Sequence, residues 1–317
     1  MWTTLLQFTG GLLLLMVGAE LLIRGGASLA LRMGVSALVV GLTVISFGTS
    51  SPELVVSVKA AWDHDSAIAL GNVVGSNICN IALVLGLSAL IRPLKVHSQV
   101  VRLEVPIMIA VTVLLGILLH NRRLSQVEGS LFGILLIAYI VYSIFQSRKV
   151  ETESAADVDP LLIKKQYSVP LALVMLVGGI ALLVPGSHFF VKASITVAQW
   201  AGLSPYVIGV TVVAVGTSLP EIATSVAGAI KGEGDMAVGN AIGSNIFNIL
   251  CILGLSAGLF GIDASSFSFV DLIAMLGFAV VSLPLLRSGF TLTRWEGALL
   301  ILLYAVYVTY LIKMGPQ

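Results

Sequence analysis

Charged residues are scarce in this sequence, and their scarcity excludes most classes of soluble protein. Asp, Glu, Lys and Arg make up 10% of the 317 residues, whereas 57% are hydrophobic and the mean hydropathy is +1.04. A soluble domain carries roughly 25% charged residues, so this chain could not cover a water-exposed surface. The composition excludes an ordinary soluble enzyme, a disordered tail and a collagen-like fibre, and it indicates a polytopic membrane protein.

Cysteine content and net charge are low as well. Cys79 and Cys251 lie inside apolar runs without the spacing of a metal site or a disulfide framework, so we interpret both as small core residues. The formal net charge of +1 provides no field that would attract nucleic acid. Because the first apolar run starts almost at Met1 without a basic segment, we expect it to be a retained span and not a cleaved signal peptide.

Ten apolar runs are long enough to cross a bilayer, which requires about 20 mostly apolar residues. The expected spans are residues 5–23, 35–60, 67–91, 103–120, 127–146, 169–191, 203–230, 236–260, 268–286 and 295–313. A polar stretch at 148–168 separates the fifth span from the sixth. We therefore predict an all-α polytopic membrane protein with a first half over 1–147, a flexible connector over 148–168 and a second half over 169–317.

Lysine and arginine are unevenly distributed between the two sides of this expected topology. Most of them lie in the loops that follow odd-numbered spans, including the connector. Cytoplasmic loops are enriched in basic residues. We therefore predict a cytoplasmic connector, both termini outside, and residence in the cell (plasma or inner) membrane.

The two halves repeat each other at a constant offset of 168 residues. Residues 41–53 (GLTVISFGTSSPE) align with 209–221 (GVTVVAVGTSLPE), and residues 71–80 (GNVVGSNICN) align with 239–248 (GNAIGSNIFN). Each half holds five expected spans, an odd number, so the second half enters the membrane from the opposite side. Two inverted five-helix repeats are typical of alternating-access transporters, which bind their substrate near mid-membrane between the repeats.

Each half carries Gly-Thr-Ser-x-Pro-Glu within an apolar run, and the motifs end at Glu53 and Glu221. Glycine tolerates unusual torsions and proline lacks a backbone donor, so we expect a broken helix whose free carbonyls can bind a cation. A charge at mid-membrane costs on the order of 3 kcal/mol or more, which makes both acids functional candidates. The repeat axis would bring them together, and neighbouring carboxylates resist joint ionisation unless a cation or a proton lies between them.

The second motif supplies neutral oxygen atoms. Helical spacing places Ser76 beside Asn80, and Ser244 beside Asn248, so we interpret these four as lining an ion site. Four further asparagines fit hydrogen bonding between helices equally well: Asn72, Asn77, Asn240 and Asn245. Carboxylate, hydroxyl, amide and carbonyl oxygens suit Ca²⁺ or Na⁺ better than zinc or copper.

The paired motifs resemble the alpha repeats of the sodium/calcium exchanger family, within the cation/calcium exchanger superfamily, and the resemblance covers essentially the whole chain. It implies that Ca²⁺ is held by Glu53 and Glu221 together with the backbone carbonyls of Thr49 and Thr217. Flanking Na⁺ sites would use four hydroxyls and two carbonyls: those of Ser50, Ser76, Ser218 and Ser244, and those of Ser46 and Ala214. Spans 1 and 6 would slide as a gating pair.

The resemblance also places Asn80 and Asn248 beside the central site. Some relatives, notably the potassium-dependent ones, have an Asp at one of these positions. Because both residues are Asn here, the sequence argues against potassium dependence and against proton coupling at these positions.

We therefore expect a secondary antiporter that exchanges Ca²⁺ for Na⁺ in the lipid bilayer, with no cofactor, no nucleic acid and no obligate protein partner. A Ca²⁺/H⁺ exchanger on the same scaffold stays open, although the serine-rich flanking positions favour Na⁺. An intramembrane enzyme would need a nucleophile beside a base or a His-Glu-x-x-His run, and the sequence offers neither. A passive channel is disfavoured because paired acids would bind the cation too tightly for fast conduction.

Overall fold

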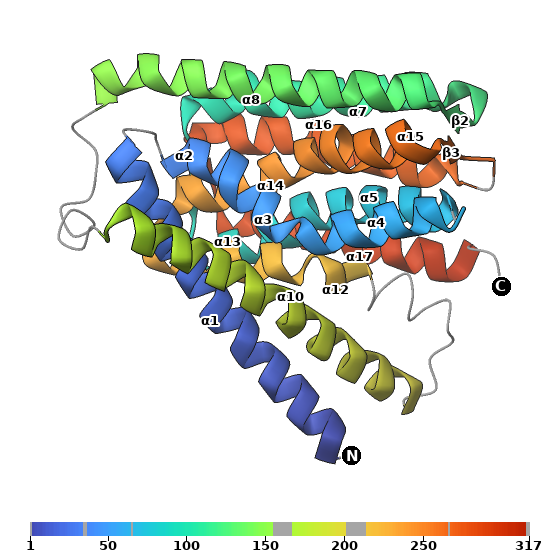
Figure 1. The fold of residues 1–317 in the computed structure, drawn as a ribbon, viewed down its shortest axis with the longest axis horizontal. Helices are drawn as coiled ribbons and strands as arrows, with labels where there is room; N and C mark the ends of the chain where they lie inside the picture. The colour runs from blue at the N-terminus through green and yellow to red at the C-terminus, as the bar shows by residue number, and fades with distance from the viewer. Residues whose placement is uncertain are drawn as a thin grey trace.

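The computed structural model describes residues 2–33, 37–64, 66–154, 167–200, 214–265 and 267–314, which are almost entirely helical (Figure 1). Eight helices in these residues are long and apolar enough to cross a membrane: Trp2–Gly26, Ser66–Ile91, Val100–Asn121, Gln126–Ser143, Val169–Phe190, Gly234–Phe260, Phe269–Phe290 and Arg294–Lys313. They coincide with eight of the expected spans. Of the remaining two, 35–60 is divided into short helices, and residues 203–213 of 203–230 lie outside the described residues.

The first half contains helices with two short strands between them. In order, its elements are α1 (Trp2–Met33), α2 (Ala37–Val40), the π-helix η1 (Gly41–Ile45), α3 (Ser46–Thr49), α4 (Ser51–Trp62), α5 (Ser66–Cys79), the π-helix η2 (Asn80–Leu85), α6 (Gly86–Ile91), β1 (Leu94–Lys95), the π-helix η3 (Val100–Glu104), α7 (Val105–Leu118), the 3₁₀-helix η4 (Leu119–Asn121), β2 (Arg123–Leu124) and α8 (Gln126–Ser154). Residues 148–154, which we expected in the flexible connector, are helical because α8 continues to Ser154.

The described elements of the second half follow a similar order, without a counterpart of η3. These are α10 (Val169–Trp200), α12 (Ala214–Thr217), α13 (Leu219–Lys231), α14 (Gly234–Phe247), the π-helix η6 (Asn248–Leu253), α15 (Gly254–Phe260), β3 (Ile262–Asp263), α16 (Phe269–Arg287), the 3₁₀-helix η7 (Ser288–Phe290), β4 (Thr291–Leu292) and α17 (Arg294–Met314). The bounds of η2 and η6 correspond residue for residue under the sequence offset, as do those of α5 and α14.

Both Gly-Thr-Ser-x-Pro-Glu motifs interrupt a helix, as predicted. The interruptions fall at Ser50, with φ −80° and ψ 9°, and at Ser218, with φ −85° and ψ 8°. Pro52 and Pro220 lie in the first turns of α4 and α13, where the missing N–H of proline costs no intrahelical bond. Each break therefore separates a short helix from the helix that carries the motif glutamate.

The short strands pair between the halves and not within them. Leu94 of β1 pairs with Leu292 of β4, and Leu124 of β2 pairs with Ile262 of β3. Under the offset of 168 residues each pairing is the counterpart of the other. Such reciprocal contacts are the pattern that a two-fold axis produces.

Helices α1 and α10 run antiparallel and cross beside the rest of the helical bundle (Figure 1). Glycines line their contact: a Cβ added at Gly18 would lie 2.9 Å from the carbonyl oxygen of Gly179, and one added at Gly11 would lie 2.9 Å from that of Gly186. These pairs are again exchanged by the repeat. The two backbones therefore touch directly, without side chains between them.

Candidate cation-binding site

The two motif glutamates lie in the interior, one on each side of the interface between the halves. Glu53 and Glu221 are both 0% exposed, and each sits in the first turn of the helix that follows a break. Asp and Glu are almost never fully buried unless they are paired. The contacts of the two carboxylates therefore indicate why they are buried.

Serines from the opposite half reach each glutamate. The hydroxyl of Ser50 donates to Oε1 of Glu221 at 2.8 Å, and the hydroxyl of Ser218 donates to Oε1 of Glu53 at 3.4 Å. Ser76 of α5 also donates to Oε1 of Glu53, at 3.4 Å. Because Ser50 and Glu53 share one helix turn, these crossed bonds bring both carboxylates into one site.

Two asparagines hold the helix breaks in place. The amide of Asn72 donates to the backbone carbonyl of Glu53 at 3.2 Å and to Ser57 at 2.9 Å. Asn240 makes the equivalent bonds, to the carbonyl of Glu221 at 3.4 Å and to Ser225 at 2.9 Å. Hydrogen bonding between helices, which the sequence left open for these two residues, is what the geometry supports.

The threonines of the two breaks approach the same asparagines. Thr49 Oγ1 lies 3.1 Å from Oδ1 of Asn240, and Thr217 Oγ1 lies 3.4 Å from Oδ1 of Asn72. Each asparagine thus ties its own motif glutamate to the helix break of the other half.

Several buried oxygen atoms at this site have no hydrogen-bond partner among the described residues. They are Oε2 of Glu53, Oε2 of Glu221, Oδ1 of Asn80, Oδ1 of Asn248 and Oγ of Ser244. A buried polar atom without a partner costs roughly 1–3 kcal/mol, and native interiors contain few of them. Clustered free oxygens from carboxylates, amides and a hydroxyl form a donor set that fits a hard cation.

Asn77 and Asn245 form hydrogen bonds to neighbouring helices. Asn77 donates its amide to the carbonyl of Asn245 at 3.2 Å and accepts the amide of Asn248 at 2.9 Å. Asn245 donates to the sulfur of Met108 on α7 at 3.3 Å. Asn77 therefore has the interhelical role, while Asn248 keeps one free oxygen.

The two expected carbonyl ligands beside the helix breaks belong to Ser46 and Ala214. The carbonyl of Ser46 accepts two hydrogen bonds, from the backbone amide of Ser50 at 3.0 Å and from the hydroxyl of Thr49 at 3.3 Å, so a cation would have to displace one of them. The hydroxyl of Ser46 donates to the carbonyl of Gly41 at 2.6 Å. Ala214 is the first residue of α12.

A buried acid that our sequence reading did not single out lies away from the site. Glu104 is 0% exposed, and its two oxygens accept hydrogen bonds from Gln99 and Tyr139, both at 2.9 Å. Unlike the motif glutamates it has a partner on each oxygen, which identifies it as part of the framework. Its position as an acid inside an apolar span is the sequence signal that could have identified Glu104.

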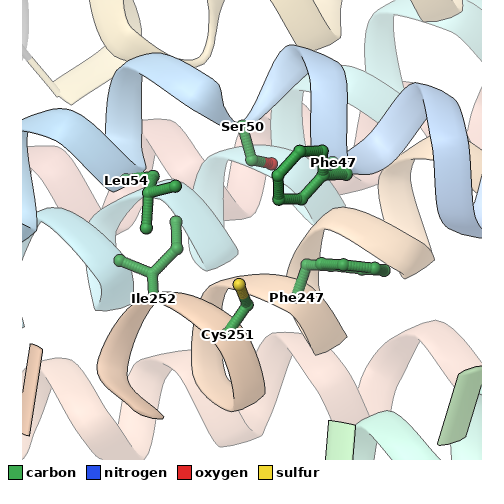
Figure 2. A pocket seen from close by; sticks show the side chains of 6 residues that line it. All are labelled: Phe47, Ser50, Leu54, Phe247, Cys251 and Ile252. Carbon is green, nitrogen blue, oxygen red and sulfur yellow. The ribbon is translucent and has the colours of Figure 1, made fainter. Parts of the chain in front are cut away.

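A narrow crevice leads to this site from the face of α3 and α4. Figure 2 shows Phe47, Ser50 and Leu54 on one wall. The opposite wall consists of Phe247, Cys251 and Ile252. Its volume of about 10 Å³ is close to the minimum for one water molecule. Ser50, which lines the crevice, also donates to Glu221, so one hydroxyl separates the crevice from a carboxylate.

Within the described ranges, no group of three or more His, Cys, Asp and Glu side chains could hold a metal ion. The acids of this site are the two motif glutamates, supported by neutral oxygens. A site with two carboxylates can attract a cation without the dense charge of a permanent metal centre.

Comparisons with known proteins agree with this arrangement. A family model described as "sodium/calcium exchanger protein" matches residues 3–146 and 171–313. The sodium/calcium exchanger MaX1 of Methanosarcina acetivorans is 33% identical over 312 residues, covering 87% of this chain and 89% of its own. The inner membrane protein YrbG of Escherichia coli is 40% identical over 225 residues, covering 69% of each. A solved structure of the sodium-calcium exchanger NCX_Mj, soaked with Na⁺ and Ca²⁺, superimposes with a TM-score of 0.82 at 30% identity over 99% of both chains.

Proposed function

Because the chain belongs to the sodium/calcium exchanger protein family of membrane antiporters, we propose that it exchanges Ca²⁺ for Na⁺ by alternating access. The observation that carries the proposal is the pair of fully buried glutamates, Glu53 and Glu221, each with one unpartnered oxygen among the described residues. Relatives named as sodium/calcium exchangers match it along almost the full chain.

The proposed architecture is ten membrane spans in two inverted five-helix repeats, over 1–147 and 169–317, joined by a cytoplasmic connector. The reciprocal strand pairings and the antiparallel crossing of α1 with α10 support it, because an axis in the membrane plane generates both. The basic residues support an orientation with both termini outside the cell or inner membrane.

The proposed Ca²⁺ ligands are Glu53 and Glu221 with the carbonyls of Thr49 and Thr217. Na⁺ would occupy flanking positions lined by Ser50, Ser76, Ser218 and Ser244, with the carbonyls of Ser46 and Ala214. Asn80 and Asn248 would face the central position. The free oxygens of Ser244, Asn80 and Asn248 support this assignment, since each is fully buried and has no hydrogen-bond partner among the described residues.

Charge balance explains why such a site exchanges ions and does not leak. Two ionised carboxylates are neutralised by one Ca²⁺ or by several Na⁺, and an empty site would leave two buried charges without compensation. Closing the site around an empty pair is therefore unfavourable. Each cation must be replaced before the carrier can return, and no cofactor or protein partner is needed for this cycle.

Transport by the purified protein in liposomes tests the coupling ion. Vesicles preloaded with Na⁺ should take up ⁴⁵Ca²⁺, and vesicles that carry only an outward-directed proton gradient should not. Vesicles with Glu53→Gln protein supply the background in both conditions. Uptake driven by protons alone would overturn Na⁺ coupling in favour of Ca²⁺/H⁺ exchange on the same scaffold.

A further inference from the structure

The pair formed by α1 and α10 contacts the two halves unequally. Ala223 and Ala227 of α13 pack against the apolar cluster that includes Leu15 and Leu22 of α1. In the described part of the chain, α10 makes no comparable contact with α4. The α4 counterpart of Ala223 is Val55, which is 68% exposed. Helix α1 of the first half thus covers α13 of the second half, whereas α4 of the first half is not covered by α10.

An ion pair fastens the covered side. Nζ of Lys231, at the end of α13, pairs with a carboxylate oxygen of Glu20 on α1, and both side chains are about one-third exposed, 30% and 34%. Arg24, one turn further along α1, pairs with the other oxygen of Glu20. This contact holds α1 on α13 and must break if α1 moves away.

At the positions equivalent to this ion pair in the other half, the acidic and basic residues are exchanged. Glu20 corresponds to His188 on α10, and Lys231 corresponds to Asp63 at the end of α4. His188 and Asp63 are both exposed, and Asp63 pairs with Lys59 on its own helix. The acid and the base have changed places, so each pair of positions joins an acidic residue to a basic one.

We propose that α10 docks on α4 in the opposite transport state and that His188 then pairs with Asp63, as Glu20 pairs with Lys231 in the present state. The inference rests on the proposed alternating-access function, because inverted repeats exchange arrangements when access changes sides. The two ion pairs then act as alternate latches. One is closed while the other is open.

The surface that α10 would cover is an apolar groove of about 410 Å³ between α4 and α15. Its lining is Leu54, Val55, Val58, Lys59, Trp62, Leu255 and Leu259. The equivalent face of α13 is the one that α1 covers. The groove therefore has the position and the chemistry needed to receive the apolar face of α10.

The two latches differ in their basic residue, which is lysine in the closed latch and histidine in the open one. Few other charged groups lie on the elements concerned: Lys192 on α10, Glu20, Arg24 and Arg32 on α1, Glu221 and Lys231 on α13, and Glu53 and Lys59 on α4. Helices α3 and α12 carry none. In the orientation proposed above, His188 and Asp63 lie on the outer side of the membrane.

Charge reversal tests the proposed pair directly. Asp63→Lys alone, or His188→Glu alone, should slow ⁴⁵Ca²⁺/Na⁺ exchange about two- to five-fold, the range expected for an exposed ion pair. The double variant recreates the Glu20–Lys231 arrangement and should restore the rate. Asp263→Lys, the same charge change at the exposed end of strand β3, is the control and should have no effect. Single variants that equal the wild type, or a double variant that combines both losses, would overturn the proposal.

A crosslinking measurement separates this proposal from the transport function itself. In a variant without Cys79 and Cys251, the pair Asp63→Cys and His188→Cys should react with a short bifunctional thiol reagent only in the state opposite to the one that links the pair Glu20→Cys and Lys231→Cys. Absence of the 63–188 product under every ion condition would refute docking, whether or not exchange occurs.

Discussion

The two halves of this molecule are nearly equivalent at the ion site and differ where the gating helices touch it. At the site, crossed serine–glutamate bonds and the bonds of Asn72 and Asn240 occur in matching pairs. Outside it, α1 covers α13 whereas α4 borders an open groove. Repeated motifs thus build one shared site, and the proposed alternation of access follows from the unequal packing of α1 and α10 against the two halves.

The site itself carries one smaller difference between the halves. Ser50 binds Glu221 at 2.8 Å, while Ser218 binds Glu53 at 3.4 Å. The shorter bond lies next to the crevice of Figure 2. Ser50 therefore holds Glu221 more firmly than Ser218 holds Glu53.

Neutralising either glutamate should have the largest effect on the exchange rate, because it disables the site that both halves share. Glu53→Gln and Glu221→Gln each remove one of two buried charges, and we expect each to lower the exchange rate by on the order of 100-fold or more, as for a broken buried pair. Glu128→Gln is the matched control, because glutamine can replace glutamate in its N-terminal helix cap, where Glu128 binds Ser125. Appreciable ⁴⁵Ca²⁺ transport by both site variants would contradict the account.

Removing the serine hydroxyls should sharpen the difference between the halves. Ser50→Ala deletes a 2.8 Å bond to a carboxylate and should weaken exchange about 10-fold, whereas Ser218→Ala deletes a 3.4 Å bond and should cost only about two- to three-fold. The Na⁺ concentration for half-maximal uptake reports the loss. Ser51→Ala, which removes a bond to the carbonyl of Phe47 only, should behave like the wild type. Equal losses at positions 50 and 218 would refute the asymmetry.

The third prediction concerns the glycine contact between α1 and α10, away from the ion site. A Cβ at Gly18 or at Gly186 would lie 2.9 Å from atoms of the other helix, while nothing lies within 4 Å of one at Gly10 or Gly178. Overpacking of this size costs roughly 1–3 kcal/mol. Gly18→Ala and Gly186→Ala should therefore slow exchange several-fold without changing Ca²⁺ affinity. Gly10→Ala and Gly178→Ala are the controls, and slowing by all four would show that the effect is not the contact.

The features predicted from sequence were those that local chemistry determines. The breaks at Ser50 and Ser218 follow from proline and glycine inside apolar runs, and the eight described membrane helices follow from run length. Helical spacing alone grouped Ser76 with Asn80. Charged and polar residues in apolar segments were informative because the bilayer gives them no solvent.

The remaining features depend on contacts between distant residues. The π-helices that begin at Asn80 and Asn248 have no simple sequence signal, and Glu20 belongs to neither repeated motif. Its partner Lys231 lies in the other half of the chain. Only the packing of α1 against α13 brings the two together, and the repeat then directs attention to His188 and Asp63.

Competition between the two cations at the glutamate pair is the central claim, and equilibrium binding measures it most directly. Purified protein should bind ⁴⁵Ca²⁺, and rising Na⁺ should displace it with a dependence steeper than one Na⁺ per Ca²⁺, while choline at equal ionic strength should not. Glu53→Gln protein should bind little Ca²⁺ at any Na⁺ concentration. Bound Ca²⁺ that is indifferent to Na⁺ would contradict the account, because both ions would then not share the pair formed by Glu53 and Glu221.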